Sequence, residues 1–164
     1  MGCGPEQSAY DRDQQQIQNQ YNALKSQLTP YVGKYKGTVT PTQGGDTLNV
    51  LLNLNPADIQ TTNPSTLTNT KTPSLNGTLI LCLSKDCGTG GETTIKIPSA
   101  SYNPTNGTLS LQTTQNITNC SGASVMFCSN YTIDLLWTSG SYNALVGNMG
   151  NSDVNQAVLN LIKQ

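Results

Sequence analysis

Five cysteines are the residues of this chain with the clearest chemistry, at positions 3, 82, 87, 120 and 128. Four of them lie within one stretch and can pair with one another. Close spacing favours the disulfides Cys82–Cys87 and Cys120–Cys128, although four cysteines allow three connectivities. A structural zinc site is the alternative, but these spacings fit it poorly and the chain has no histidine. Disulfides predict an oxidising compartment such as a periplasm or a cell surface.

The absence of histidine also reduces the number of possible catalytic mechanisms, because serine triads and imidazole metal sites depend on that residue. A pair of carboxylates is the remaining option, since two acids alone can hydrolyse a glycoside. The candidate acids sit in turns, beside cysteines or on outward strand faces, where solvated acids are usual: Asp46, Asp58, Asp86, Glu92 and Asp134. We therefore predict no enzyme, no catalytic residue, no metal and no cofactor, with a carboxylate-dependent hydrolase as the alternative.

The composition is polar but nearly uncharged. Charged residues make up 10% of the chain and the net charge is -1. The eight Lys and Arg are scattered, so no basic patch is available to bind phosphates, and we expect no nucleic-acid partner. Abundant Thr favours strands, while Asn, Gly and Pro favour turns. No stretch approaches the roughly 20 apolar residues of a transmembrane helix.

Cys3 is left over when the other four cysteines pair. Gly2-Cys3 resembles the end of a bacterial lipobox, in which a small residue precedes the cysteine that is acylated, and a Gln-rich polar stretch follows it. The resemblance implies lipid attachment at Cys3, export to the bacterial cell envelope, and a position at the outer membrane or its periplasmic face. It requires a leader peptide in place of Met1. The alternatives are a free cysteine and N-myristoylation, which favours Ser or Thr where this chain has Glu6.

Apolar residues at helical spacing predict two helices. Ile17, Tyr21, Leu24 and Leu28 form one stripe, which predicts a helix over residues 13–29 that caps a domain. A second helix over 153–163 is predicted from a similar stripe of Val154, Ala157, Val158, Leu161 and Ile162. Residues 1–12 are expected to be the lipid-anchor tether, and residues 13–164 one domain.

Between the two predicted helices the apolar period changes to two. In residues 31–40 the tyrosines, glycines and Val39 share one face, while Lys34 and Lys36 share the other. The same alternation predicts further strands near residues 48–54, 79–83, 95–97, 109–111, 131–137 and 142–146. Short turns join them, which predicts an antiparallel meander. Residues 55–75 carry three prolines and are expected to form an irregular loop with a short edge strand near 66–71.

Seven or eight such strands between two helices resemble the calycin, or lipocalin-like, β-barrel, over about residues 31–150. The resemblance implies an antiparallel barrel that binds a small apolar ligand, with a cavity lined by Tyr31, Tyr35, Trp137 and Tyr142, although these four fit a filled core as well. A β-sandwich is the alternative fold. We expect a non-enzymatic envelope lipoprotein that binds a small apolar ligand or an envelope protein. The alternative is a structural or interaction module that uses the 55–75 loop or the first helix.

Overall fold

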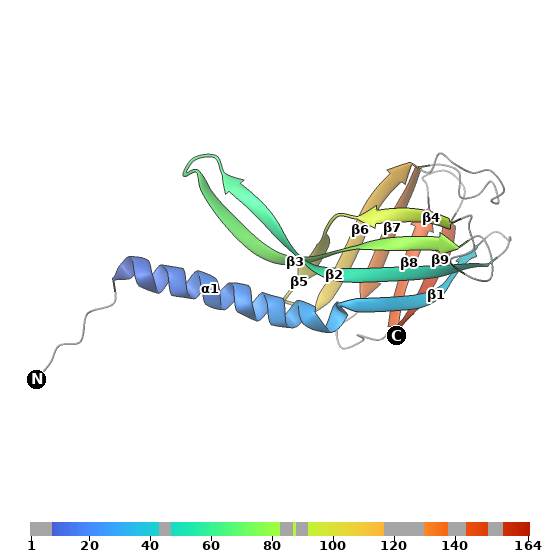
Figure 1. Cartoon of the computed structure of the whole chain (residues 1–164), viewed down its shortest axis with the longest axis horizontal. Helices are drawn as coiled ribbons and strands as arrows, with labels where there is room; N and C mark the ends of the chain where they lie inside the picture. Colours follow the sequence, from blue (N-terminus) through green and yellow to red (C-terminus); the bar gives the residue numbers. More distant parts are fainter. Residues whose placement is uncertain are drawn as a thin grey trace, which may run out of the picture.

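In the computed structural model, one long helix leads into a curved antiparallel sheet (Figure 1). The structure describes residues 8–42, 47–82, 87, 92–116, 130–137, 144–150 and 156–164. The elements are α1 (Ala9–Leu28), the 3-10 turn η1 (Thr29–Tyr31), β1 (Gly33–Pro41), β2 (Leu48–Asn63), β3 (Thr68–Cys82), β4 (Glu92–Ile97), β5 (Ala100–Asn103), β6 (Thr108–Asn116), β7 (Asn130–Trp137), β8 (Ala144–Gly150) and β9 (Gln156–Lys163).

Every strand pair is antiparallel, as the meander prediction requires, and the sheet order is β4-β3-β2-β1-β9-β8-β7-β6-β5. The first and last strands of the chain are therefore neighbours at the centre of the sheet. The two edge strands, β4 and β5, follow one another in the sequence. All the strands predicted from the apolar alternation are present, and β5 and β9 add to them.

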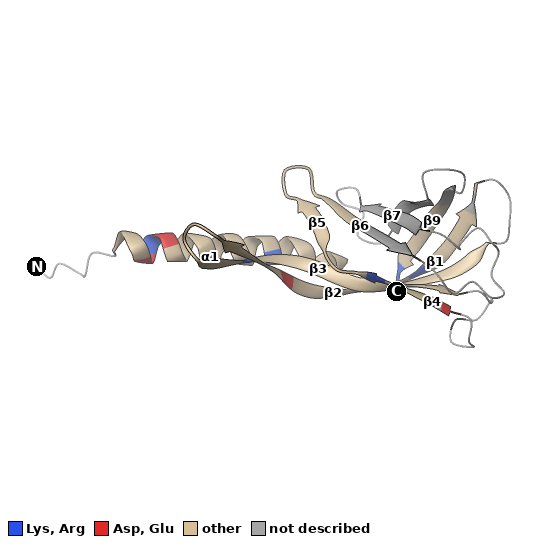
Figure 2. Ribbon diagram, turned by 90° about the horizontal axis from the view of Figure 1, so that it is seen from above, with Lys and Arg blue, Asp and Glu red and all other residues tan. Residues whose placement is uncertain are grey.

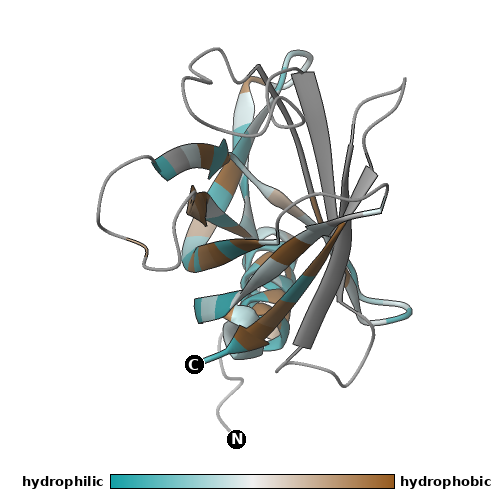
Figure 3. Ribbon diagram, turned by 90° about the vertical axis from the view of Figure 1, so that its right-hand side faces the viewer, coloured by the Kyte–Doolittle hydropathy of each residue, from teal (hydrophilic) through white to brown (hydrophobic). Residues whose placement is uncertain are grey.

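The alternation in β1 faces the way its residues predict. Tyr35 and Val39 are buried, whereas Lys34, Lys36 and Thr40 are exposed. The same inward rows continue around the sheet and make one core, whose apolar interior is visible from the end of the sheet (Figure 3). That core contains Leu28, Tyr31, Tyr35, Val39, Val50, Leu52, Leu54, Leu75, Leu79, Leu81, Ile95, Ile97, Ala100, Leu109, Leu111, Leu159 and Leu161.

The predicted C-terminal helix over 153–163 is wrong, because residues 156–163 form strand β9. This strand pairs with β1 on one side and β8 on the other. Leu159 and Leu161 point into the core, while Ile162, counted in the predicted helical stripe, is 61% exposed. Two neighbouring strands offer hydrogen bonds along the whole segment, and this tertiary pairing overrides a weak local helix preference.

The predicted irregular loop at residues 55–75 is also wrong, although the short strand predicted near 66–71 coincides with the start of β3 at Thr68. Strands β2 and β3 stay paired throughout it, up to the closing pair Asn63↔Thr68. The rest of the sheet leaves them earlier, since β1 accompanies β2 only as far as Leu54 and β4 accompanies β3 only from Gly77. Residues 56–75 consequently project from the sheet as a two-stranded ribbon, which we call the arm (Figure 1).

The ladders leave β4 and β5 as sheet edges, so the closed barrel stays a prediction. A side chain nevertheless bridges the gap near these edges. Ser74 of β3 is 4% exposed, its hydroxyl donates to the Ala100 carbonyl of β5 at 3.0 Å, and it accepts from the Ala100 N–H at 3.3 Å. One hydroxyl thus satisfies two backbone groups that face away from β6.

The Cys82–Cys87 disulfide is present, as the close spacing predicts, with an S–S distance of 1.99 Å. It joins the end of β3 to the following segment. Cys3, Cys120 and Cys128 lie outside the described residues.

Removing this disulfide in the double variant Cys82→Ala, Cys87→Ala is expected to lower the free energy of unfolding by about 2 kcal/mol, because the crosslink restricts a short loop in the unfolded chain. Urea unfolding with and without reductant checks this. With reductant, wild type and variant should be equally stable, because the predicted Cys120–Cys128 disulfide is then reduced in both. A variant as stable as the oxidised protein would contradict the prediction.

Candidate binding groove between helix α1 and the arm

Tyr31 and Tyr35, predicted for a ligand cavity, are core residues. They are 2% and 1% exposed. The Tyr35 hydroxyl donates to the Tyr31 carbonyl at 2.7 Å, and the Tyr31 hydroxyl donates to the Gly107 carbonyl at 3.2 Å. The Tyr31 ring also packs at a tilt on Tyr102, with 6.2 Å between centroids. Their polar ends are satisfied inside the chain, as buried tyrosines require. For Trp137 only the backbone is described, and Tyr142 lies outside the described residues.

Helix α1 begins at Ala9, earlier than the predicted residue 13, because Ser8 caps it. The Ser8 hydroxyl accepts from the Asp11 N–H at 3.1 Å. The carboxylate of Asp11 in the first turn and Lys25 in the last complement the helix dipole. At the other end, the Thr29 hydroxyl donates to the Lys25 carbonyl at 2.9 Å.

Only the C-terminal part of the apolar stripe of α1 packs against the domain that the helix was predicted to cap. Leu28 is buried and Leu24 is half-buried, but every residue from Ala9 to Gln20 is exposed, including Ile17 at 51%. The first half of the helix extends beyond the sheet, and the arm projects to the same end of the molecule (Figures 1 and 2). The unburied part of the stripe is therefore available to a partner outside the chain.

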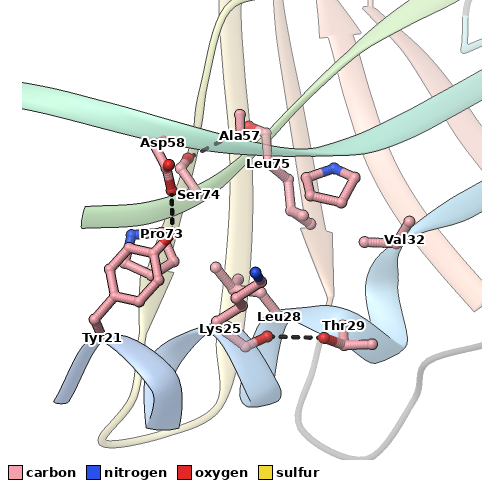
Figure 4. A pocket seen from close by; sticks show the side chains of 11 residues that line it. Tyr21, Lys25, Leu28, Thr29, Val32, Ala57, Asp58, Pro73, Ser74 and Leu75 are labelled. Carbon is pink, nitrogen blue, oxygen red and sulfur yellow. Dashed lines mark hydrogen bonds between the residues drawn. The ribbon is translucent and has the colours of Figure 1, made fainter. Parts of the chain in front are cut away.

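A pocket of about 400 Å³ lies where α1 meets the base of the arm. Figure 4 shows side chains from the helix, from β2 and from β3 converging on it. Its lining is mainly apolar, with a few polar groups at the rim: Tyr21, Lys25, Leu28, Thr29, Val32, Pro56, Ala57, Asp58, Pro73, Ser74 and Leu75.

A second pocket of about 680 Å³ lies farther out, between the exposed half of α1 and the outer arm. Ile17 and Tyr21 supply its apolar surface, and amides, hydroxyls and one ammonium group supply the rest: Gln14, Gln18, Gln60, Thr68, Asn69, Thr70 and Lys71. Tyr21 lines both pockets, which makes them neighbouring parts of one groove. We call the two together the helix–arm groove.

Tyr21 connects the two walls of this groove. Its hydroxyl donates to Asp58 Oδ1 of β2 at 2.8 Å (Figure 4). The hydrogen bond to Asp58, followed by desolvation and the negative charge of Asp58, raises the pKa of Tyr21 above its ordinary value of 10.0. Each effect favours the protonated phenol, which is the form that can donate.

The hydrogen bond between Tyr21 and Asp58, which we call the latch, should therefore depend on pH. A raised pKa in the folded state means that the contact is intact below about pH 10 and is lost as the pH rises through the folded value. Because the chain has seven tyrosines, the titration of Tyr21 is obtained as the difference in absorbance at 295 nm between wild type and Tyr21→Phe. When Asp58→Ala is present in both proteins of this comparison, the titration of Tyr21 should move to lower pH. A wild-type curve already at the ordinary value would exclude the latch.

The predicted ligand-contacting residues include none of the groove residues, but the alternative of an interaction module named the first helix and residues 55–75, which form the two walls of the groove. The Ile17 and Tyr21 stripe was assigned to intramolecular packing, and residues 55–75 were assigned to a loop. Among the described residues, no group of three or more Cys, Asp or Glu could hold a metal ion. In the same part of the chain, no helix is long and apolar enough to cross a membrane. No model of a known protein family matches the chain, and no curated protein shows significant sequence similarity to it.

Proposed function

We propose that this chain is a non-enzymatic lipoprotein of the bacterial cell envelope, held to the membrane through a lipid on Cys3, and that it binds a segment of another envelope protein in the helix–arm groove. One observation carries the binding site. The outer half of helix α1 extends beyond the sheet with its stripe residue Ile17 51% exposed, and an open groove runs between it and the arm. Helices normally depend on packing of that stripe for stability, so an outside partner would supply what the fold leaves out.

The chemistry of the groove suits a polypeptide. Gln14, Gln18, Gln60 and Asn69 present amide groups, which both donate and accept hydrogen bonds as a peptide backbone does. Ile17 and Tyr21 provide apolar contact, and aromatic residues are common anchors at interfaces. The net charge of -1 gives no basis for strong steering by charge. Recognition would therefore depend on shape and hydrogen bonding.

We also propose that the sheet is a closed, calycin-like barrel with a filled interior. The pairing of β9 with β1 and the Ser74 bridge to Ala100 support it. In that arrangement the sheet is a support for the helix and the arm, and binding takes place outside it.

Site-specific photo-crosslinking in the native envelope tests the groove. A photoreactive residue at Ile17 or at Thr70 probes opposite walls, and one at Gln16, which lines a different face of α1, is the matched control. Adducts at 17 and 70 should contain the same protein, which the control should not capture. The purified partner should then bind Ile17→Arg at least about tenfold more weakly than Gln16→Arg. Equal capture at all three positions, or equal affinity of the two variants, would refute the proposed site.

A further inference from the structure

The tip of the arm and the β5–β6 turn have the same loop structure, and this gives a comparison within one chain. The loops are Asn63–Thr68 and Asn103–Thr108, and both start with Asn-Pro. In each, the Asn side-chain oxygen accepts from the N–H two residues later at 2.9 Å. In each, the fifth residue donates its N–H to the Asn carbonyl, at 2.8 Å in the arm and 2.9 Å in the β5–β6 turn.

The two loops differ at that fifth residue, which adopts a positive φ in both. The β5–β6 turn has Gly107 there, with φ 65°, and the arm has Leu67, with φ 54°. Glycine adopts this conformation freely, whereas a residue with a branched side chain is strained in it. Leu67 is also 81% exposed, so no packing within the chain compensates the strain. An apolar side chain kept at a strained, exposed position suggests a contact outside the chain.

The surroundings of Leu67 indicate what that contact is. No charged residue occurs between Asp58 and Lys71, so residues 59–70, which include the tip of the arm, are uncharged (Figure 2). The start of α1 lies at the same end of the molecule, and Tyr10 in its first turn is 71% exposed. The residues from Cys3 to Ser8 can span at most roughly 18 Å. A lipid on Cys3 would therefore hold this end of the protein close to the bilayer.

We propose that Leu67 inserts into the interfacial region of the membrane and that the arm is a second membrane contact beside the lipid anchor. This proposal rests on the proposed anchoring through Cys3. An uncharged loop tipped by one leucine can enter the headgroup boundary without burying a charge. Alone it would bind weakly, but the anchor raises its effective concentration at the surface. Two contacts fix an orientation that one flexible tether leaves free, and they set the helix–arm groove next to the membrane.

The test uses the full chain attached chemically to vesicles, so that it is independent of natural acylation. The thiol of Cys3 is coupled to a maleimide-headgroup lipid in phosphatidylcholine vesicles. Leu67→Trp reports on the arm, and Thr105→Trp, exposed in the matching turn, is the control. Subtracting the wild-type spectrum removes the signal of Trp137.

On attachment, the emission of Leu67→Trp should shift to shorter wavelength, and lipids brominated in the upper acyl chain should quench it roughly twofold more than the control. Leu67→Gly should unfold no more easily than wild type, because the substitution relieves strain. If the tryptophan at position 67 still emits as a water-exposed residue when the protein is attached to vesicles, the membrane contact is overturned. If it becomes buried only when a protein partner is added, the arm binds that partner instead. Mass analysis of the Cys3 peptide from native membranes tests the anchor separately, so the two failures are distinguishable.

Discussion

Gly37→Ala is expected to lower the free energy of unfolding by about 3 kcal/mol or more, the largest effect of any substitution proposed for this protein. A Cβ atom at this position would lie 1.8 Å from the Asn160 carbonyl oxygen and 2.8 Å from Leu161 Cα, both backbone atoms of β9. Backbone atoms in a paired strand cannot swing aside as a flexible side chain would. Strands β1 and β9 would have to separate at the centre of the sheet.

Urea unfolding followed by circular dichroism measures this effect, with Thr38→Ala as the control in the same strand. The control should change stability by no more than about 0.5 kcal/mol. The result also tests the structure of the C-terminal segment. If residues 153–163 formed a helix, their backbone would not pair with β1, and Gly37→Ala would meet no such clash. A Gly37→Ala variant as stable as wild type would contradict the pairing of β1 with β9.

Ser74→Ala is expected to lower the free energy of unfolding by about 2 to 4 kcal/mol, since it leaves two buried backbone groups of Ala100 without their hydroxyl partner. The substitution should weaken mainly the contact between β3 and β5. Amide hydrogen exchange at Ala100 should therefore accelerate more than exchange in β1.

Ser101→Ala is the matched control, because Ser101 is the exposed neighbour of Ala100 in β5. It should leave both stability and exchange nearly unchanged. If the two serine variants behave alike, the bridge does not join the edges of the sheet, and the proposed closure of the barrel loses its main support.

The molecule has two parts that differ in how much of their apolar surface is buried: the sheet, and the end formed by the helix and the arm. The sheet is stabilised by a continuous apolar core. The outer half of α1 and the outer arm bury almost none of their side chains, and they carry four of the five large hydrophobic residues exposed in the described part of the chain: Tyr10, Ile17, Ile59 and Leu67. Exposed apolar groups gathered on one projecting end are typical of an interaction surface. The groove and the membrane contact proposed above both use this end.

The sequence alone predicted elements whose signal is local. The alternation of Tyr35 and Val39 with Lys34 and Lys36 predicted β1 and its buried face, because charged side chains at every second position exclude the opposite orientation. The helical stripe from Ile17 to Leu28 predicted α1 and its C-terminal end. The short spacing of Cys82 and Cys87 favoured the disulfide that the structure contains.

The C-terminal segment shows where a local signal is ambiguous. Its apolar residues fit a helical stripe through Val158 and Ile162, but Leu159 and Leu161 fit strand alternation equally well. Over so short a segment neither period excludes the other. The choice depends on pairing with two strands: β8, which precedes the segment directly in the sequence, and β1, which lies far away in it.

The arm and the groove were decided entirely by tertiary structure. Residues 58–72 of the arm project into water and bury neither face, so Thr61, Thr62 and their neighbours carry no apolar alternation that would reveal a strand. The groove exists only because the arm projects along the unburied stripe of α1, and no pattern within either segment specifies the other. The sequence therefore determined which faces are buried and which cysteines lie close, because those properties depend on neighbouring residues. The pairing of β1 with β9, the bridge near the sheet edges and the groove depend on distant segments meeting, and only the folded chain decides them.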